Sequence, residues 1–156
     1  MTTTLSTRLS QADLADVSTN VQMPTYDRTK LDIGIVHIGI GAFHRCHQAE
    51  FLEDVAEAGY GQGMAGINLA PPEIEPALAP QDCLYSRTLA HGDERETRII
   101  GVIRKVLDYS NSPEGCRNLI ANPLVSTVTM TVTEKGYCHV PSTGKLDETN
   151  VNVVRD

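Results

Sequence analysis

The residues whose types and spacing best suit chemistry are Gly39 and Gly41, which stand between a short apolar run and a segment of helical periodicity. The first backbone N–H groups of a helix have no intrahelical acceptor, and the helix dipole places partial positive charge beside them. A pyrophosphate can accept hydrogen bonds from such groups when no Cβ stands in its way. The backbone amides of Gly41, Ala42 and Phe43 are therefore predicted to bind an anionic dinucleotide.

This glycine pattern departs from the usual dinucleotide fingerprint, so a second interpretation stays open. His44 stands where a third glycine or alanine is usual, and the second strand ends at Asn68, where an acidic residue commonly holds the adenosine ribose. Glu73 is the nearest carboxylate. On the pattern alone, the alternative is a structural turn between a strand and a helix that binds nothing.

The elements that must position this turn form a strand–helix–strand unit. Ile33 to Ile38 is apolar and rich in β-branched residues, which predicts a strand covered on both faces, and residues 64–69 predict a second strand. Residues 43–58 between them have helical period, and the stripe predicted to be their apolar face comprises Phe43, His47, Phe51, Val55 and Ala58. A right-handed crossover should join the two strands.

The second half of the chain predicts further strands and a helix. Residues 83–103 predict a hairpin that turns at His91 to Asp93, and residues 113–121 predict a helix. In residues 125–133 a row of threonines, expected to be ordinary sheet surface, alternates with Val128, Met130 and Val132. This alternation of strands and helices indicates an α/β protein.

Composition and charge exclude several classes of function. The 156 residues have a formal net charge of −7, so no basic surface for nucleic acid is expected. No apolar run approaches the roughly 20 residues that cross a bilayer, and no secretory leader is recognisable, so we expect a cytoplasmic protein without a membrane partner. The four cysteines are widely spaced and His44 to His47 lacks a second ligand cluster, so no metal site is predicted.

Two longer motifs resemble a known enzyme family. Residues 34–48, GIVHIGIGAFHRCHQ, resemble the opening motif of the long-chain polyol dehydrogenases, the family of mannitol 2-dehydrogenase and fructuronate reductase. Residues 131–138, TVTEKGYC, resemble the second N-terminal signature of that family. Between these two motifs, residues 81–85 and 99–101 also resemble family segments and stand in the family's order. The likeness as a whole extends from about Val21 onward.

The resemblance implies a fold and a division of the chain. Family members have an N-terminal Rossmann-type domain, with a mostly parallel sheet flanked by helices, and a mostly helical C-terminal domain. Residues 1–30 are expected to be an N-terminal extension and residues 31–156 an incomplete Rossmann-type domain. The family's catalytic lysine, asparagine and histidine belong to the C-terminal domain, which this chain lacks. The fragment is therefore expected to contain no catalytic residue and to be inactive alone.

The resemblance also implies which residues contact the cofactor. Those at the pyrophosphate would be Gly39, Gly41, Ala42 and Phe43. Asn68 would lie where the adenosine ribose binds, and the residues near the nicotinamide ribose would be Thr133, Glu134 and Lys135. A solvated ion pair with Glu134 is the alternative for Lys135, and a general base is less favoured because a turn rarely supplies the burial that proton transfer needs. The implied cofactor is NAD, with NADP as the alternative.

The function implied by the resemblance is hydride transfer between a nicotinamide cofactor and a polyol or ketose. The favoured reaction is the conversion of D-mannitol to D-fructose. The small sugar or polyol substrate would bind in the full-length enzyme. A fructuronate or related uronate reductase is the alternative within the family. The alternative from another class is a nucleotide-binding module without catalysis. Apolar surface left uncovered on such a fragment also makes self-association unsurprising.

Overall fold

Four parallel strands form the central sheet of the computed structural model, which describes residues 8–155 apart from the side chains of Glu134 and Lys135. Across the sheet the strand order is β6-β3-β2-β7. The chain thus begins in the middle of the sheet, moves to one edge and then crosses to the other. The strands are Ile33–Ile38 (β2), Gly63–Asn68 (β3), Ile103–Asp108 (β6) and Thr127–Met130 (β7).

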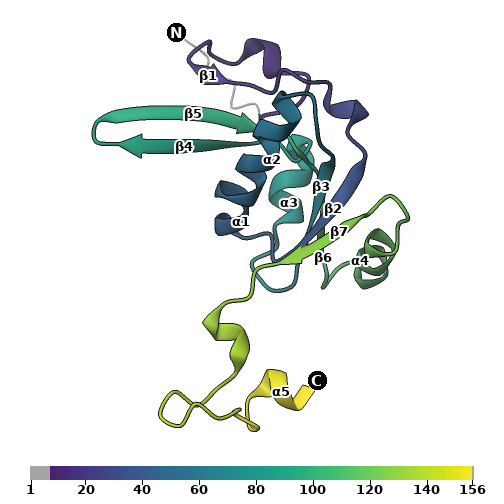
Figure 1. Ribbon diagram of the computed structural model, residues 1–156, viewed down its shortest axis with the longest axis vertical. Helices are drawn as coiled ribbons and strands as arrows, with labels where there is room; N and C mark the ends of the chain where they lie inside the picture. Colours follow the sequence, from purple (N-terminus) through teal and green to yellow (C-terminus); the bar gives the residue numbers. More distant parts are fainter. Residues whose placement is uncertain (1–7, 156) are drawn as a thin grey trace.

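Helices cover both faces of this sheet (Figure 1). On one face lie α1 (Ala42–Cys46), α2 (Gln48–Glu57) and α3 (Glu75–Leu78), and on the other lies α4 (Pro113–Ile120). One apolar core, which contains Ala49, Met64 and Leu78, lies beneath α2 and α3. A second core, beneath α4, contains Val36, Ile67 and Leu119. Because alternate residues of β2 and β3 enter the two cores, their sequences are almost continuously apolar, and the predicted α/β class is confirmed.

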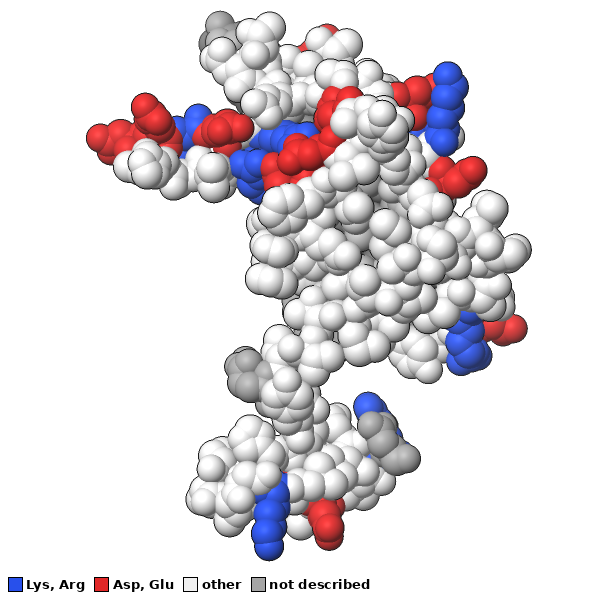
Figure 2. All heavy atoms as spheres, viewed as in Figure 1, with Lys and Arg blue, Asp and Glu red and all other residues white. Residues whose placement is uncertain are grey.

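A smaller sheet lies beside the α2 end of the domain. It consists of β1 (Val21–Gln22), β5 (Glu94–Ile100) and β4 (Tyr85–His91), in that order. β4 and β5 are antiparallel and turn at Gly92 and Asp93, as the sequence predicts. The Nε atom of Arg87 on β4 donates to Glu50 of α2 at 2.8 Å, which ties the hairpin to the helix. Figure 2 shows charged side chains gathered on this hairpin and the neighbouring end of α2.

The segment before residue 30 is bonded to the domain. It contains the 3-10 helices η1 (Leu14–Asp16) and η2 (Arg28–Lys30). Arg28 is only 3% exposed, and its guanidinium donates to the carbonyl oxygens of Gly101 at 2.7 Å and Asp82 at 2.8 Å. The boundary of the extension at residue 30 stays a prediction, but this segment is joined to the rest by buried hydrogen bonds.

Beyond β7 the chain leaves the sheet and forms a projecting segment (Figure 1). The segment contains the 3-10 helix η4 (Glu134–Tyr137), a bridge between His139 and Leu146, and the short helix α5 (Val151–Arg155). The remaining 3-10 helix, η3 (Ala79–Gln81), follows α3 directly. The outer edge of β7 has no neighbouring strand among the described residues.

The helix predicted for residues 43–58 is interrupted at His47. This residue has φ −129° and ψ −83°, outside the helical region, so that α1 ends at Cys46 and α2 begins at Gln48. The prediction of a single helix is therefore wrong, although both pieces lie where the periodicity places them.

The stripe predicted to be the apolar face of this helix is not its buried face. Phe43 is 66% exposed and Phe51 is 61% exposed, whereas Ala49 and Glu53 are fully buried. Small side chains let the helix approach the sheet closely, and the Glu53 carboxylate is accommodated because it accepts the N–H groups of Gly101 and Val102, both at 2.8 Å. The hydrophobicity of the residues reveals neither the close approach of the helix to the sheet nor the hydrogen bonds that accommodate Glu53.

Candidate functional site

The turn between β2 and α1 contains the two glycines singled out in the sequence. The N–H of Gly39 donates to the carbonyl of Ile67 in β3 at 2.8 Å, and the N–H of Gly41 donates to Gly39 at 2.7 Å. Ile40 between them is fully buried and lies against Gly66, where an added Cβ would come within 2.1 Å of the Ile40 side chain. The turn is thus held in place from the β3 side, and α1 begins directly after it.

The two glycines are needed for different reasons. Gly39 has φ +97°, a left-handed conformation that L side chains rarely adopt. Gly41 has φ −78°, which any residue can adopt, and an added Cβ there would meet only the Gly39 oxygen, at 3.9 Å. Neither conformation nor packing therefore requires glycine at position 41. The absence of a side chain at Gly41 leaves open space at the amino end of α1, which a bound phosphate group would require.

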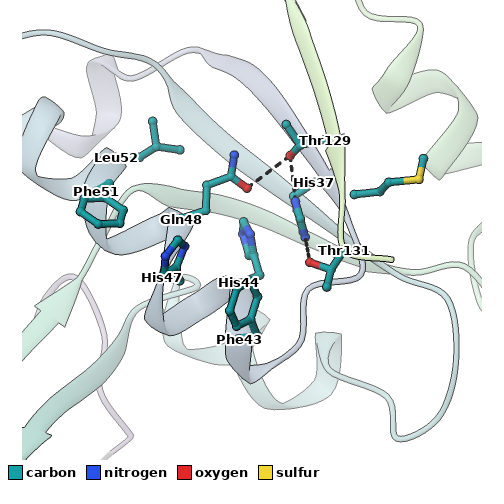
Figure 3. Close-up of a pocket in the computed structure, with 10 residues that line it drawn as sticks. His37, Phe43, His44, His47, Gln48, Phe51, Leu52, Thr129 and Thr131 are labelled. Carbon is teal, nitrogen blue, oxygen red and sulfur yellow. Dashed lines mark hydrogen bonds between the residues drawn. The ribbon is translucent and has the colours of Figure 1, made fainter. Parts of the chain in front are cut away.

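A cavity of about 460 Å³ opens beside this turn, between α1, α2 and the end of β7 (Figure 3). It lies where the strand order reverses, between β2 and β7. Ligands of open parallel α/β sheets bind at such switch points, outside the carboxyl ends of the strands. The lining residues are His37, Phe43, His44, His47, Gln48, Phe51, Leu52, Thr129, Met130 and Thr131.

Two stacked imidazole rings form the inner wall of the cavity. The rings of His37 and His44 lie 3.7 Å apart and almost parallel. His44 is 1% exposed and neither of its ring nitrogens has a hydrogen-bond partner among the described residues. Burial, together with the neighbouring His37, lowers the pKa of His44 to about 3, so that its ring is neutral at physiological pH.

His37 is held by two hydroxyl groups, one in β7 and one directly after it. Its Nδ1 lies 2.8 Å from Oγ1 of Thr129, and its Nε2 lies 3.0 Å from Oγ1 of Thr131 (Figure 3). Thr129 donates its own proton to Gln48 at 3.3 Å, so His37 donates from Nδ1 and accepts at Nε2. Burial lowers the pKa of His37 as well. The prediction that the threonine face is ordinary sheet surface is therefore wrong for Thr129 and Thr131.

The exposed aromatic residues of α1 and α2 lie at the mouth of the cavity. Phe43 and His47 stack with their ring centroids 5.1 Å apart, and the ring of Phe51 meets His47 edge-on at 5.2 Å. These are residues of the stripe that periodicity assigns to the core. The spacing of four residues does place these side chains on one face, as predicted, but this face lines the cavity and does not pack on the sheet.

Asn68, at the carboxyl end of β3, is bonded to a buried carboxylate. Its side-chain amide donates to Oδ1 of Asp108 at 2.7 Å and to the carbonyl of Pro72 at 3.0 Å. Glu73, the nearest acidic residue in the sequence, instead accepts a hydrogen bond from Asn111 at 2.9 Å. The end of β3 thus presents a neutral amide where many dinucleotide-binding domains have an acidic residue.

The three residues predicted near the nicotinamide ribose lie just beyond β7. Thr133 is exposed and precedes η4, which begins with Glu134 and Lys135. The side chains of Glu134 and Lys135 lie outside the described residues. The residues that sequence reasoning misses are His37, Gln48, Thr129, Thr131 and Asp108. For Thr129 and Thr131, the regular alternation of threonines in the sequence is a signal that could have identified them.

Within residues 8–155, no helix is both long and apolar enough to cross a membrane. The same residues contain no group of three or more histidine, cysteine, aspartate or glutamate side chains that could hold a metal ion.

A parallel sheet with this strand order, a glycine turn after its central strand and a cavity at the switch point define a Rossmann-type dinucleotide-binding domain. The family model of the mannitol dehydrogenase Rossmann domain matches residues 33–153. The chain belongs to the mannitol dehydrogenase family, and it is the cofactor-binding domain of that oxidoreductase family, whose members use NAD or NADP.

Several curated relatives are similar over nearly the whole chain. A polyol:NADP oxidoreductase of Gluconobacter oxydans is 34% identical over 95% of this chain, and a D-mannonate oxidoreductase of Escherichia coli is 34% identical over 92%. A mannitol 2-dehydrogenase of Pyrenophora tritici-repentis is 35% identical over 96%. The chain spans only 32%, 30% and 27% of the length of these relatives, respectively.

Two solved structures share the fold. The Pseudomonas fluorescens mannitol 2-dehydrogenase, in a ternary complex with NAD and D-mannitol, has a TM-score of 0.81 and is 31% identical over 92% of this chain and 30% of its own. A substrate-free D-sorbitol dehydrogenase has a TM-score of 0.80 at 31% identity, over 96% of this chain and 32% of its own.

Proposed function

We propose that this chain binds a nicotinamide dinucleotide, NAD in the first place and NADP as the alternative, as the cofactor-binding part of a polyol oxidoreductase. The observation that carries the proposal is Gly41, whose side chain is missing where neither backbone nor packing requires it. The amides of Ala42 and Phe43 would hold the pyrophosphate across the open space at Gly41, whose own N–H already donates to Gly39, so the amide predicted at position 41 is used within the turn. When bound, the nicotinamide supplies the hydride or accepts it.

The remaining contacts follow from the path of the strands. Asn68 lies at the carboxyl end of β3, on the adenosine side of the glycine turn. Thr133, Glu134 and Lys135 follow β7, whose last residues line the cavity, so we place the nicotinamide ribose near them. The chain's own groups would bind and orient the cofactor, and the reacting lysine would come from another domain.

For the substrate we propose D-mannitol, oxidised to D-fructose, since a relative named mannitol 2-dehydrogenase is 35% identical and a solved mannitol 2-dehydrogenase shares the fold with a TM-score of 0.81. A uronate reductase is the second candidate because a D-mannonate oxidoreductase is 34% identical. We expect the 156-residue chain to bind cofactor in the cytoplasm but not to turn over substrate by itself. A nucleotide-binding module without catalysis is the remaining alternative.

Titration of the chain with NADH tests the cofactor proposal. We expect enhanced NADH fluorescence and a rise in melting temperature, because a ligand that binds only the folded state stabilises it. The substitution Gly41→Val should weaken NADH binding at least about tenfold by filling the space that the pyrophosphate needs. Because φ at this position is −78° and no neighbour is crowded, the melting temperature without ligand should stay within a few degrees of wild type.

The control substitution is Ala121→Val, which also introduces a valine, at an exposed position after α4 on the other face of the sheet. It should leave NADH binding unchanged. If the wild-type chain shows neither a fluorescence change nor thermal protection, or if the Gly41→Val chain binds NADH normally, the proposal is wrong.

A further inference from the structure

Asp108 is a buried carboxylate with an unusual set of partners at the carboxyl edge of the sheet. It ends β6, is 1% exposed, and accepts the N–H groups of Ile74 and Glu75, both at 3.0 Å. Its third donor is the side-chain amide of Asn68, at 2.7 Å. Burial by itself would raise the pKa of Asp108, but the three hydrogen bonds outweigh it and hold this pKa below its ordinary value.

These bonds fix which way the Asn68 amide faces. Both of its recorded contacts, Asp108 and the carbonyl of Pro72, are acceptors, so each must receive a proton from the amide nitrogen. Both amide hydrogens are thereby used. The Oδ1 atom of Asn68 is left as an acceptor to which no described residue donates, on a side chain that is only half-buried.

Asn68 is adjacent to the glycine turn. The preceding residue, Ile67, accepts the hydrogen bond from Gly39 that holds the turn, so the ends of β2 and β3 lie side by side. In a Rossmann-type domain with a dinucleotide on this turn, the side chain that ends the second strand faces the ribose of the adenosine half. A ribose hydroxyl is a donor, and a fixed amide oxygen is a suitable acceptor for it.

We propose that Asp108 is a positioning residue, which orients Asn68 so that its Oδ1 accepts a hydrogen bond from a ribose hydroxyl of the adenosine half of the cofactor. The inference rests on the proposed function and adds to it the orientation of one contact. Asp108 itself does not touch the cofactor. Its two backbone contacts, at Ile74 and Glu75, also hold the start of α3 beside the same edge.

The test compares the binding of ADP with that of 2′-deoxy-ADP and 3′-deoxy-ADP by calorimetry. Because a single hydrogen bond is at stake, the wild-type chain should bind ADP about three- to tenfold more tightly than at least one of the two analogues. The substitution Asn68→Ala should abolish this preference. Asp108→Ala should reduce it to less than about twofold, since alanine offers no acceptor to the Asn68 amide, which is then no longer fixed.

The matched control is Glu53→Ala. Glu53 is also a fully buried carboxylate that accepts two backbone N–H groups, but it binds Gly101 and Val102 at the amino end of β6, the opposite edge of the sheet. This variant should keep the wild-type preference for ADP, even if its melting temperature changes. The double variant Asn68→Ala/Asp108→Ala should show no further loss beyond Asn68→Ala.

The outcomes separate this inference from the proposed function. If the wild-type chain binds neither NADH nor ADP, both fail. If it binds NADH but binds ADP and both deoxy analogues equally, or if folded Asp108→Ala keeps the preference, only the inference is overturned. Should Asp108→Ala fail to fold, Asn68→Ala decides by itself: an undiminished preference for ADP contradicts the assignment.

Discussion

His44 shows how a single residue can depart from a fingerprint without blocking the site. It stands where the fingerprint usually has a third small residue, but its ring is buried and stacks on the ring of His37, with the two centroids 3.7 Å apart. The space beside Gly41 therefore remains open. Because its buried ring has no hydrogen-bond partner among the described residues, it is accommodated only in the neutral form.

The stability of the domain should therefore depend on the protonation of His44. Its pKa is about 3 in the folded chain and near 6.5 in the unfolded chain, so below pH 6.5 the unfolded state binds the extra proton. The free energy of unfolding should fall as the pH decreases from 6.5 towards 3, by up to about 1.4 kcal/mol per pH unit from this group. Urea denaturation at pH 7 and pH 5 measures the effect.

His44→Phe isolates this contribution, because phenylalanine can still stack on His37 but cannot take up a proton. The loss of unfolding free energy between pH 7 and pH 5 should be smaller in this variant than in the wild type. Replacing the exposed His91 by asparagine should leave the loss unchanged. Equal pH dependence of wild type and His44→Phe would contradict the prediction.

The position of a single residue in the fold can be predicted where the cause is local. Gly39 and Gly41 are recognisable because a turn between a strand and a helix depends on adjacent backbone torsions. The role of Thr129 is not recognisable from the sequence, because its partner His37 is 92 positions away and the two meet through strand pairing. The same holds for Asn68 and Asp108, which are 40 positions apart.

At the scale of elements, the break at His47 and the close approach of α2 to the sheet decide which helix face is buried. Phe51 should accordingly contribute little to stability despite its size. We expect Phe51→Ser to lower the free energy of unfolding by less than about 1 kcal/mol, because this ring is already 61% exposed. Chemical denaturation of the two chains measures the difference.

Ala49→Leu is the comparison within the same helix. Ala49 is fully buried in the core beneath α2, so a larger side chain should overpack it and cost roughly 1–3 kcal/mol. If Phe51→Ser were the more destabilising of the two, the stripe predicted from periodicity would be the core-facing one after all. The central strands β2 and β3, in contrast, were predictable, since runs buried on both faces need only be apolar, whereas the strand Ile103–Asp108 (β6) was not predicted.

At the scale of the whole molecule, Arg28 joins three parts of the chain. Its guanidinium donates to Gln11 at 2.7 Å, to Asp82 at 2.8 Å, and to Gly101 and Ile103 at 2.7 and 3.2 Å, which connects the N-terminal segment to the end of η3 and the start of β6. We expect Arg28→Lys to lower the free energy of unfolding by about 2–4 kcal/mol, because one ammonium cannot reach all four acceptors.

Arg95→Lys serves as the control, since Arg95 is exposed on β5 and, among the described residues, its hydrogen bonds go to carbonyls of its own hairpin. It should change the free energy of unfolding by less than about 0.5 kcal/mol. A comparably small effect of Arg28→Lys would contradict the prediction and would mean that these hydrogen bonds do not hold the N-terminal segment to the domain.

The sequence by itself determined the class of the fold, the strand–turn–helix unit and the family, because these depend on apolar periodicity, on glycines at fixed spacing and on contiguous motifs. Only the tertiary structure decided which face of α1 and α2 is buried, which strand residues enter the cavity, and that Asp108 meets Asn68. Those features depend on hydrogen bonds and packing between segments far apart in the chain, and no local pattern of residue types encodes such pairings.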